Sequence, residues 1–411
     1  MLSSSFLNFR VADTDDVPHI KSVREMLEVY VPKVINGKSV DTSALEERSM
    51  SESLGRSVIP VGSCRDMHKT YATSFDTVRI GRILEDLDTF AVWLCYRHNQ
   101  GLANVGRDPV HHPMVIVTAC VDRIELHQDL LELERDVHME GFVSWVGRSS
   151  MEVTMQLLQQ ASTSAVFRRV LEARFVTVAV EPRARDAPAA SAIRAVPVHP
   201  LRTETAEQEA AFKRGEANKK RRTMMDAESL LRQPPTEEER RLLHELFLKT
   251  IDESSHTFRQ RLLPAGSVWM EDTKLKTAII CFPDQKNLYG KIFGGFLMRA
   301  AFELAWANAW IHCGCRPTIL AIDDIMFRRS VKVGSLLFLS SEVCYTSRRC
   351  SQLRVHAEAI DARDGSRFTT NTFHFTFAAP SDVPAVVPKT YADGMLYLSA
   401  KRHLEAYERL L

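Results

Sequence analysis

The sequence predicts an α+β fold made of two tandem copies of one unit, each a long central helix wrapped by an antiparallel β-sheet. Short motifs recur about 200 positions apart, which is typical of an internal repeat. In both halves a strand-like run precedes an apolar helical pattern, and several more strand-like runs follow it. The chain has 411 residues, a length that suits two domains.

Composition and charge narrow the class of protein. The formal net charge is +1, so electrostatics give no reason to expect nucleic acid or an anionic membrane as the main partner. The most apolar stretch, 292–311, is interrupted by Arg299, Glu303 and Asn308, which predicts a buried helix and no membrane span. The eight Cys are scattered without a CxxC pair, a pattern that favours reduced thiols over disulfides or a zinc site.

The first half contains an extension and then one complete unit. Residues 17–35 have apolar side chains at helical spacing, and residues 38–56 are polar. A β-like texture begins at Ser57, and residues 67–75 are expected to be a strand. A helix is expected after Gly81, because the apolar residues that follow it fall on one stripe. Further strands are expected at 114–121, 130–139, 142–146, 151–158 and 175–180.

The composition changes at 181–241, where Pro, Ala and Arg give way to a stretch of mixed charge that contains Lys219-Lys-Arg-Arg222. A basic cluster this short among Glu residues predicts the solvated face of a linker helix. The predicted segments are an N-terminal extension, a first domain, a charged linker, a second domain and a C-terminal helix, at 1–56, 57–180, 181–241, 242–385 and 386–411.

The motif with the most chemical content is Asn287-Leu-Tyr-Gly-Lys-Ile-Phe-Gly-Gly295, which leads directly into an apolar helix. The adjacent glycines let the backbone approach a ligand closely, so Gly294 is expected to contact the substrate. The amides of Gly295 and Phe296 are at the positive end of the helix dipole and can hold an oxygen that becomes negative during a reaction. Asn287 adds a neutral donor and acceptor. A plain turn before a core helix would show the same pattern.

Matching segments indicate how the two halves correspond. We interpret one half as a divergent copy of the other, with strands again expected at 268–282, 319–331, 335–345, 351–360 and 368–377. The matched segments are 68–70 with 275–277 at an offset of 207, 121–124 with 322–325 at 201, 145–153 with 345–353 at 200, and Phe175 with Phe375 at 200.

The tandem arrangement and the motif Asn-x-x-Gly-x-x-x-Gly-Gly resemble the double hot-dog acyl-coenzyme A thioesterases, over roughly residues 57–180 and 245–380. The resemblance implies two hot-dog domains that hydrolyse fatty acyl-coenzyme A to fatty acid and coenzyme A, with no cofactor besides the coenzyme A of the substrate. It also implies a homo-oligomer, a trimer of double units. Together with a weak transit-peptide pattern in the Ser-rich residues 1–10 it implies the mitochondrial matrix; a cytoplasmic location is the alternative.

In this family an Asn and a helix N-terminus from one unit face an acid on the central helix of the other. Aligning Gly81 with Gly295, without a gap, places Asp88 at the acid position and opposite Phe302. The resemblance therefore implies one composite site per chain, formed by Asp88 and Asn287. A boundary Asp that is salt-bridged to a neighbour would show the same spacing.

The opposite pairing is expected to be inactive. Phe75 to Gly81 spans six residues where Phe282 to Gly295 spans thirteen, so the Asn-bearing loop is expected to be missing from the first half. Glu303, next to the lost acid position, is expected to support the site without touching the substrate.

Other polar residues receive secondary roles. His98 and His312 match each other at the helix ends and are expected to bind carbonyl groups and not to catalyse. Candidate contacts for the phosphates of coenzyme A occupy matching turns of the two halves, although ordinary hairpin turns would look the same: Arg148, Ser149, Ser150, Ser347, Arg348 and Arg349.

The predicted reaction is thioester hydrolysis, with Asp88 as a general base on water or as a nucleophile; the sequence leaves both open. Two other functions also stay open. A hot-dog hydratase or dehydratase would need an Asp and His pair before the helix, where the chain has Asp284 and no His. A non-catalytic acyl-coenzyme A-binding protein would keep the pocket without needing Asp88.

Overall fold

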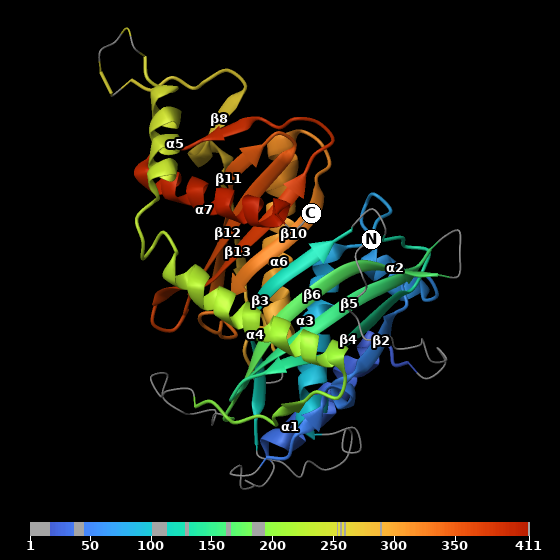
Figure 1. The fold of residues 1–411 in the computed structure, drawn as a ribbon. Helices are drawn as coiled ribbons and strands as arrows, with labels where there is room; N and C mark the ends of the chain where they lie inside the picture. Colours follow the sequence, from blue (N-terminus) through green and yellow to red (C-terminus); the bar gives the residue numbers. More distant parts are fainter. Residues whose placement is uncertain are drawn as a thin grey trace. The chain divides into compact units, whose positions relative to one another are not determined.

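The chain forms two compact units in a computed structural model (Figure 1) that describes residues 17–36, 45–100, 113–127, 131–161, 166–182, 194–252, 254, 257–258, 260–287 and 290–409. The first unit combines Met1–Lys219 with Asp284–Arg299, and the second combines Lys220–Pro283 with Ala300–Leu411. These units differ from the predicted domains, because residues 284–299 of the second repeat pack with the first repeat. Residues 1–10, which carry the transit-peptide pattern, lie outside the described residues.

The first unit is a helix-covered antiparallel sheet with the strand order β2-β4-β5-β6-β3. A short parallel pair, β1 with β7, lies beside it. Its elements in chain order are α1 (Ile20–Ile35), β1 (Arg48–Ser49), η2 (Met50–Ser53), β2 (Gly55–Ile59), α2 (Arg65–Tyr71), α3 (Ile80–Gln100), β3 (Val115–Leu126), β4 (Val137–Val146), β5 (Ser150–Gln160), β6 (Phe167–Val180), β7 (Leu201–Arg202) and α4 (Ala206–Ala227).

The central helix of this unit, α3, is buried on all sides. The sheet covers one side, and α1 covers another through an edge-to-face contact between Tyr30 and Tyr96, whose ring centroids are 6.1 Å apart. Close approach to the sheet needs glycine: a Cβ at Gly141 would lie 2.8 Å from the side chain of Leu94. The enclosure has a cost, because it buries carboxylates of α3 in an apolar layer.

The second unit repeats this sheet in the order β10-β13-β12-β11-β9, again antiparallel. A short parallel pair, β14 with β8, corresponds to β1 with β7. Its elements are α5 (Glu237–Leu248), β8 (Ser267–Trp269), η6 (Met270–Thr273), β9 (Leu275–Ile280), η7 (Pro283–Gln285), α6 (Gly294–Cys313), β10 (Thr318–Met326), β11 (Leu336–Ser347), β12 (Cys350–Ile360), β13 (Arg367–Ala378), β14 (Ala385–Val387) and α7 (Tyr391–Glu408). The helices α4, η7 and α6 each continue from one unit into the other.

The strand pairing corrects one part of the predicted repeat. Residues 68–70 and 275–277, matched above at an offset of 207, are not equivalent: the former lie in α2, where a strand was expected, and the latter in β9. The strand that corresponds to β9 is β2, at an offset of 220. Ser53 and Thr273 show this, because each hydroxyl donates to the carbonyl three residues earlier and accepts from the amide of a matched valine of the neighbouring strand. The matches at 201 and 200 are confirmed by the pairs Val121↔Phe175 and Ile322↔Phe375.

The charged segment that was predicted as a solvated linker forms α4, which crosses the sheet of the first unit (Figure 1). Its buried face rests on β4 and β5: Asn218 Nδ2 donates to Glu152 Oε1 at 3.0 Å, and Lys219 Nζ lies 5.1 Å from the centre of the Trp145 ring. A smaller cluster of Met50, Phe142 and Ala211 joins α4 to η2 and β4. The basic segment therefore belongs to a helix that is docked on the sheet along one face, with Lys219 among its contacts.

The closest contact of α4 yields a stability prediction. A Cβ at Gly215 would lie 2.3 Å from Cβ of Trp145, so the Gly215→Ala variant must move the helix or the ring; we expect it to lose about 1–3 kcal/mol of unfolding free energy. The control is Gly394→Ala in α7, where the nearest atoms are the movable methyl groups of Leu243 at 3.3 Å. Helix propensity should dominate there and change stability by less than about 1 kcal/mol. Urea denaturation of both variants measures the difference, and equal effects would contradict the tight docking of α4.

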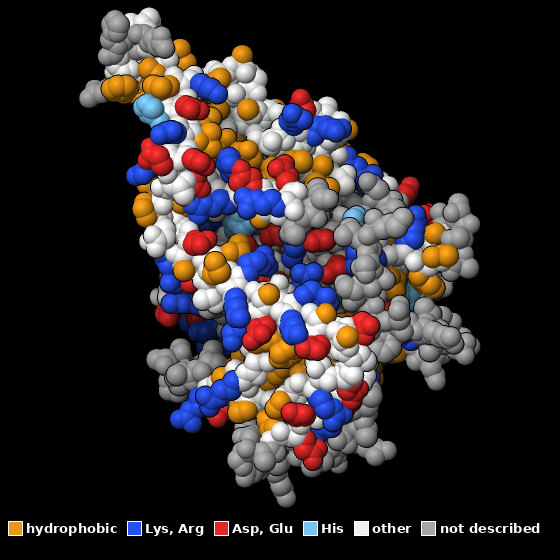
Figure 2. All heavy atoms as spheres, in the orientation of Figure 1, with side chains coloured by type: hydrophobic (Ala, Val, Ile, Leu, Met, Phe, Trp, Pro, Cys, Tyr) orange, Lys and Arg blue, Asp and Glu red, His pale blue; other side chains and the backbone are white. Residues whose placement is uncertain are grey.

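The surface shows mixed charge. On the face drawn in Figure 2, Lys and Arg side chains alternate with Asp and Glu, in keeping with a formal net charge of +1. In the described part of the chain, no helix has the length and apolar character that crossing a membrane would need.

Candidate active site

The candidate site is centred on Asp88, a carboxylate in the middle of α3 with 2% of its surface exposed. Thr118 Oγ1 of β3 donates to Oδ1 at 2.5 Å, and the backbone amide of Gly295 donates to Oδ2 at 2.7 Å. Burial raises the pKa of Asp88 to about 6, although both hydrogen bonds act to lower it. A carboxylate with this pKa is ionised at neutral pH and still basic enough to accept a proton.

The amide of Gly295 reaches Asp88 because α6 begins against the backbone of α3. A Cβ on Gly295 would lie 2.8 Å from Cα of Glu85, so no larger residue fits there without displacing one helix. Asp88 follows Glu85 by almost one helical turn, which places its carboxylate beside the first turn of α6. The structure thus brings together two predicted site residues from the two repeats, Asp88 and Gly295.

The loop before α6 is held by the side chain that the sequence singled out. Asn287 Oδ1 accepts the amide of Lys291 at 3.0 Å, the amide of Asn287 donates to the Lys291 carbonyl at 2.5 Å, and Gly290 closes the turn with φ +71°. Lys286 and Ile292 pair across the base of the loop. Asn287 is therefore fixed by its oxygen, which gives its amide group a defined direction.

The first repeat contains the same loop, which corrects the expectation that it is missing. Thr73 lies 214 positions before Asn287, the offset that also relates Gly81 to Gly295. Its amide donates to the Thr77 carbonyl at 2.9 Å, its hydroxyl accepts the Thr77 amide at 3.3 Å, and Asp76 has φ +52° where Gly290 has φ +71°. Treating Phe75 as equivalent to Phe282 led to the expectation that the loop is missing. The two are not equivalent, since the segment that contains α2 lengthens the first repeat. The first repeat therefore keeps the loop but has Thr73 at the position of the Asn.

The acid position of the second repeat has become apolar. Phe302 is 6% exposed, and its ring centroid lies 6.0 Å from that of Phe375 and 6.2 Å from that of Phe377. Ile319, fully buried, stands where the first repeat has Thr118. One repeat therefore has Asn287 without an acid, and the other has Asp88 without an Asn.

Thr118 is the site residue that the sequence analysis missed. The offset of 201 between Val121 and Ile322 also pairs Thr118 with Ile319, so a polar residue accompanies the acid and an apolar one accompanies Phe302. This joint difference between the repeats is the sequence feature that could have identified Thr118. It was hidden because Thr is ordinary in a β-strand and draws no notice by itself.

The amides at the start of α6 have different surroundings. Gly295, expected to face a developing oxyanion, donates to Asp88 instead. For the amide of Phe296, no described group acts as an acceptor, and this residue is 6% exposed in the first turn of the helix. Gly294, half-buried, is the first residue of α6.

The six turn residues proposed for phosphate contact lie at the opposite ends of the central helices. The turn at 148–150 precedes Met151, whose sulfur accepts from Asn99 near the end of α3, about 16 Å along the helix from Asp88. The turn at 347–349 has a matching place beside Cys313 of α6. The carbonyls of Arg148 and Arg348 accept amides from Val198 and Val383, so each turn also supports the chain segment that follows the sheet.

Both histidines bind carbonyl groups, as expected. His98 Nε2 bonds the His199 carbonyl at 2.9 Å and His312 Nε2 bonds the Pro384 carbonyl at 3.1 Å, so both bind backbone in matching places. The carbonyls belong to the segments after the sheets and not to the helix ends. Burial lowers the pKa of His98 to about 4. Glu303 is half-buried on α6 in the second unit, and its supporting role stays a prediction.

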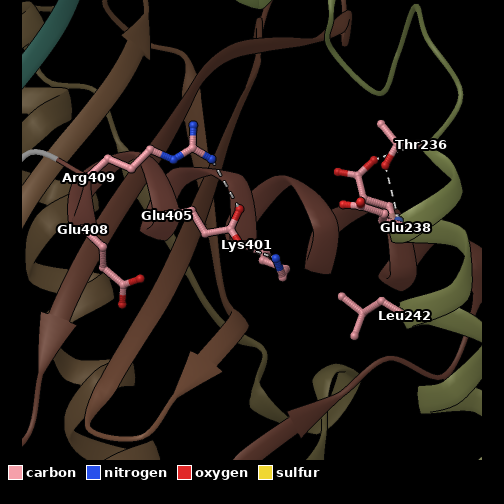
Figure 3. Close-up of a pocket in the computed structure, with 8 residues that line it drawn as sticks. Thr236, Glu238, Leu242, Lys401, Glu405, Glu408 and Arg409 are labelled. Atoms are coloured by element: carbon pink, nitrogen blue, oxygen red, sulfur yellow. Dashed lines mark hydrogen bonds and ion pairs between the residues drawn. The ribbon is translucent and has the colours of Figure 1, made fainter.

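A surface pocket of about 750 Å³ lies between α5 and α7 of the second unit (Figure 3). Its charged side chains are largely paired with each other: Glu405 bonds Lys401 and Arg409, and Glu239 caps Thr236. A lining of this kind does not suit an acyl chain, and we do not assign it to the site. Among the described residues no cluster of three metal-binding side chains occurs.

Several known proteins are similar in sequence to this chain over most of its length. The thioesterase superfamily model matches residues 289–366. The chain is 43% identical over 401 residues to acyl-coenzyme A thioesterase 9, mitochondrial, of Bos taurus, covering 96% of this chain and 86% of that protein. It is 32% identical over 328 residues to acyl-coenzyme A thioesterase 2, chloroplastic, of Humulus lupulus, covering 78% and 70%. A solved hexameric acyl-CoA thioesterase is 27% identical, covers 35% of this chain and 96% of its own, and has a TM-score of 0.34.

Proposed function

This chain belongs to the acyl-coenzyme A thioesterase family, and we infer that it hydrolyses fatty acyl-coenzyme A to a fatty acid and coenzyme A at the site around Asp88. It has the tandem hot-dog fold of that family, with an antiparallel sheet around a central helix in each repeat. The observation that carries the site assignment is the buried carboxylate of Asp88, held by two uncharged donors, the Thr118 hydroxyl of β3 and the Gly295 amide at the start of α6.

In the first step Asp88 accepts a proton from water, and the water oxygen attacks the thioester carbonyl carbon. The carbonyl oxygen becomes negative, and the amide of Phe296 and the side chain of Asn287 are the proposed donors to it. Gly295 and Thr118 hold the carboxylate in place. This replaces the expectation that Gly295 itself binds the oxyanion.

In the second step the tetrahedral intermediate collapses and the carbon–sulfur bond breaks. The sulfur leaves as thiolate and takes the proton that Asp88 received, which gives coenzyme A and restores the carboxylate. No cofactor takes part in this sequence. The alternative is nucleophilic attack by Asp88 on the thioester carbonyl carbon, which forms an anhydride that water then hydrolyses. Single-turnover hydrolysis in ¹⁸O water, followed by mass analysis of the Asp88 peptide, separates the two, because only the nucleophilic route labels the carboxylate.

The distance of the turn residues from Asp88 suits the length of the substrate. Coenzyme A carries its phosphates at the far end of a long pantetheine arm from the thioester. We propose that Arg148 and its neighbours, about 16 Å along α3 from Asp88, contact these phosphates. For the turn at 347–349 of the second unit, phosphate contact stays a prediction. An increase in KM without a fall in kcat on removing Arg148 would support this assignment.

The pH dependence of the reaction follows from the pKa of Asp88. The base must be ionised, so kcat/KM should fall as the pH drops below about 6. Thr118→Val removes a donor that stabilises the carboxylate, so this decline should begin about one pH unit higher and kcat should fall about tenfold. Thiol release measured from pH 5 to pH 9 checks both. A profile that does not change in Thr118→Val would contradict the assignment of Asp88 as the base.

Two further properties follow from the relatives. We propose a mitochondrial location, which the names of the 43%-identical proteins support, and within the mitochondrion we propose the matrix. We also propose a homo-oligomer, a trimer of double units. Light scattering coupled to gel filtration measures the mass against 46.6 kDa for one chain.

The simplest test of the function is release of coenzyme A from acyl-coenzyme A, followed with a thiol reagent over a series of chain lengths. Turnover that depends on Asp88 supports a thioesterase. Tight binding without turnover would instead favour an acyl-coenzyme A-binding protein.

A further inference from the structure

Three charged side chains form a chain of ion pairs next to Asp88. Arg299 Nε of α6 lies 3.1 Å from Glu85 Oε1, and Arg82 Nη1 lies 2.7 Å from Glu85 Oε2. The side chain of Glu85 is 9% exposed, that of Arg299 16% and that of Arg82 32%. Glu85 is thus a nearly buried acid between two cations, and only the pair with Arg299 joins two helices.

The ion pair and the Asp88 hydrogen bond connect the same two segments. Gly295 and Arg299 are one turn apart on α6, and Glu85 and Asp88 are almost one turn apart on α3. Between them the backbones nearly touch, since a Cβ on Gly295 would meet the Glu85 carbonyl at 3.2 Å. A shift of α6 that broke the ion pair would therefore also move the Gly295 amide away from Asp88.

The two partners occupy matching positions of the repeat. Glu85 and Arg299 are 214 positions apart, as are Gly81 and Gly295. Two identical copies would place the same side chain at both positions, and two like charges that face each other repel. The opposite charges are possible only because the two halves of this chain have diverged, in parallel with the loss of one acid and one Asn.

We propose that Glu85 and Arg299 are positioning residues that lock the start of α6 onto α3 and so hold the Gly295 amide on the carboxylate of Asp88. The inference rests on the proposed function, since Asp88 is the base only in that proposal. Removing Arg299 cuts the ion pair that joins α6 to α3 and leaves Glu85 paired with Arg82 of its own helix, which favours separation of the two segments.

The effect on Asp88 is mechanical and not a direct effect of charge. Burial raises the pKa of Asp88, and the hydrogen bonds from Thr118 and Gly295 lower it. The charged groups closest along its own helix are Glu85 and Asp86, α6 adds Arg299, and β3 presents the uncharged Thr118. A higher pKa of Asp88 in Arg299→Gln that does not occur in Arg82→Gln therefore reports the loss of the Gly295 hydrogen bond, because both variants remove a cation from Glu85.

The test compares Arg299→Gln with Arg82→Gln. Both remove a cation from Glu85, but only Arg299→Gln cuts the connection between α3 and α6, which makes Arg82→Gln the matched control. Arg299→Gln should lower kcat about tenfold and move the acid limb of kcat/KM up by about one pH unit. Arg299→Lys should restore most of kcat and most of the original pH profile, and Arg82→Gln should leave kcat and the pH profile unchanged.

A second readout does not depend on catalysis. Hydrogen exchange of the Gly295 amide, measured in peptides that span 293–299, should accelerate at least tenfold in Arg299→Gln and not in Arg82→Gln. Faster exchange supports the positioning role even if Asp88→Asn keeps full activity, an outcome that would overturn the proposed function alone. Unchanged exchange and an unchanged pH profile, with only a lower melting temperature, would show that the pair is structural and would overturn the inference.

Discussion

Replacing Asp88 by Asn is expected to lower kcat for thioester hydrolysis about 10³-fold and to leave the protein folded. Without a carboxylate no group at this position accepts the proton from water, and losses of this size are typical when a principal catalytic group is removed. Asn keeps the shape of the side chain, and its oxygen can still accept from Gly295, which donates to Asp88 at 2.7 Å. Thiol release under saturating substrate measures the loss.

The same change should increase stability above pH 6. The pKa of Asp88 is about 6 in the folded protein and 3.8 as an ordinary Asp, so the folded state binds the proton more tightly. Stability is therefore lost as the pH rises from about 4 to 6, and the full cost, up to about 3 kcal/mol, remains at pH 7.5. The Asn variant does not bear this cost. The difference between its unfolding free energy and that of the parent protein should therefore increase, in favour of the variant, as the pH rises from about 4 to 6.

Asp86→Asn is the matched control for both effects. Asp86 lies on the same helix, is 4% exposed, and has its pKa raised by burial to about 7. Its partners are Tyr71, which donates a short hydrogen bond, and Arg24 at 3.6 Å, and neither belongs to the site. We expect kcat within about threefold of the parent value. An equal loss in both variants would mean that any buried charge on α3 matters, and Asp88 would not be the base.

Replacing Asn287 by Thr is expected to lower kcat about 10²- to 10³-fold with little change in KM. Thr keeps an oxygen that can accept the amide four residues later, as Thr73 does at 3.3 Å in the first repeat, so the loop should keep its shape. What Thr lacks is the amide group, the proposed donor to the thioester carbonyl.

Asn287→Ala tests the loop and the chemistry together, because it also removes the acceptor for Lys291 at 3.0 Å. If Thr restored the activity that Ala loses, the side chain would only hold the loop. Equal and large losses in both variants, with an unchanged melting temperature in Asn287→Thr, would support a direct role in the reaction.

The repeated fold could be predicted from the sequence because its signals are local. The strands and the two central helices have clear apolar patterns, and the pairs 121 with 322 and 175 with 375 are equivalent in the sheets. One Asp and one Asn in opposite halves were also visible, since Asp88 follows Gly81 by seven residues and Asn287 precedes the matching Gly295 by eight.

The offset between the repeats could not be read from short matches, because it changes along the chain. It is 220 at η2 and η6, 214 at the Thr73 and Asn287 loops, and 201 at β3 and β10. The insertion that contains α2 accounts for the first change. Hydrogen bonds that close a turn are not evident from residue types, so the loop of the first repeat appeared to be missing.

Side-chain surroundings were the least predictable feature. The apolar stripe of α3 does not reveal that Glu85 and Asp86 are buried, because it is α1 and the start of α6 that cover them. Whether other segments cover this side of α3 depends on contacts between parts of the chain that are distant in sequence. The hydrogen bond from Thr118 to Asp88 is also a contact of this kind, because the two residues are 30 positions apart.

The most direct test of the account is a double-mutant cycle on kcat with Asp88→Asn and Asn287→Thr. If both residues act on one thioester in a single site per chain, the double variant should be within about threefold of the worse single variant, because groups that act as a unit are strongly non-additive. If instead the two losses multiply, to about 10⁵-fold or more, the residues act independently and the single composite site is wrong.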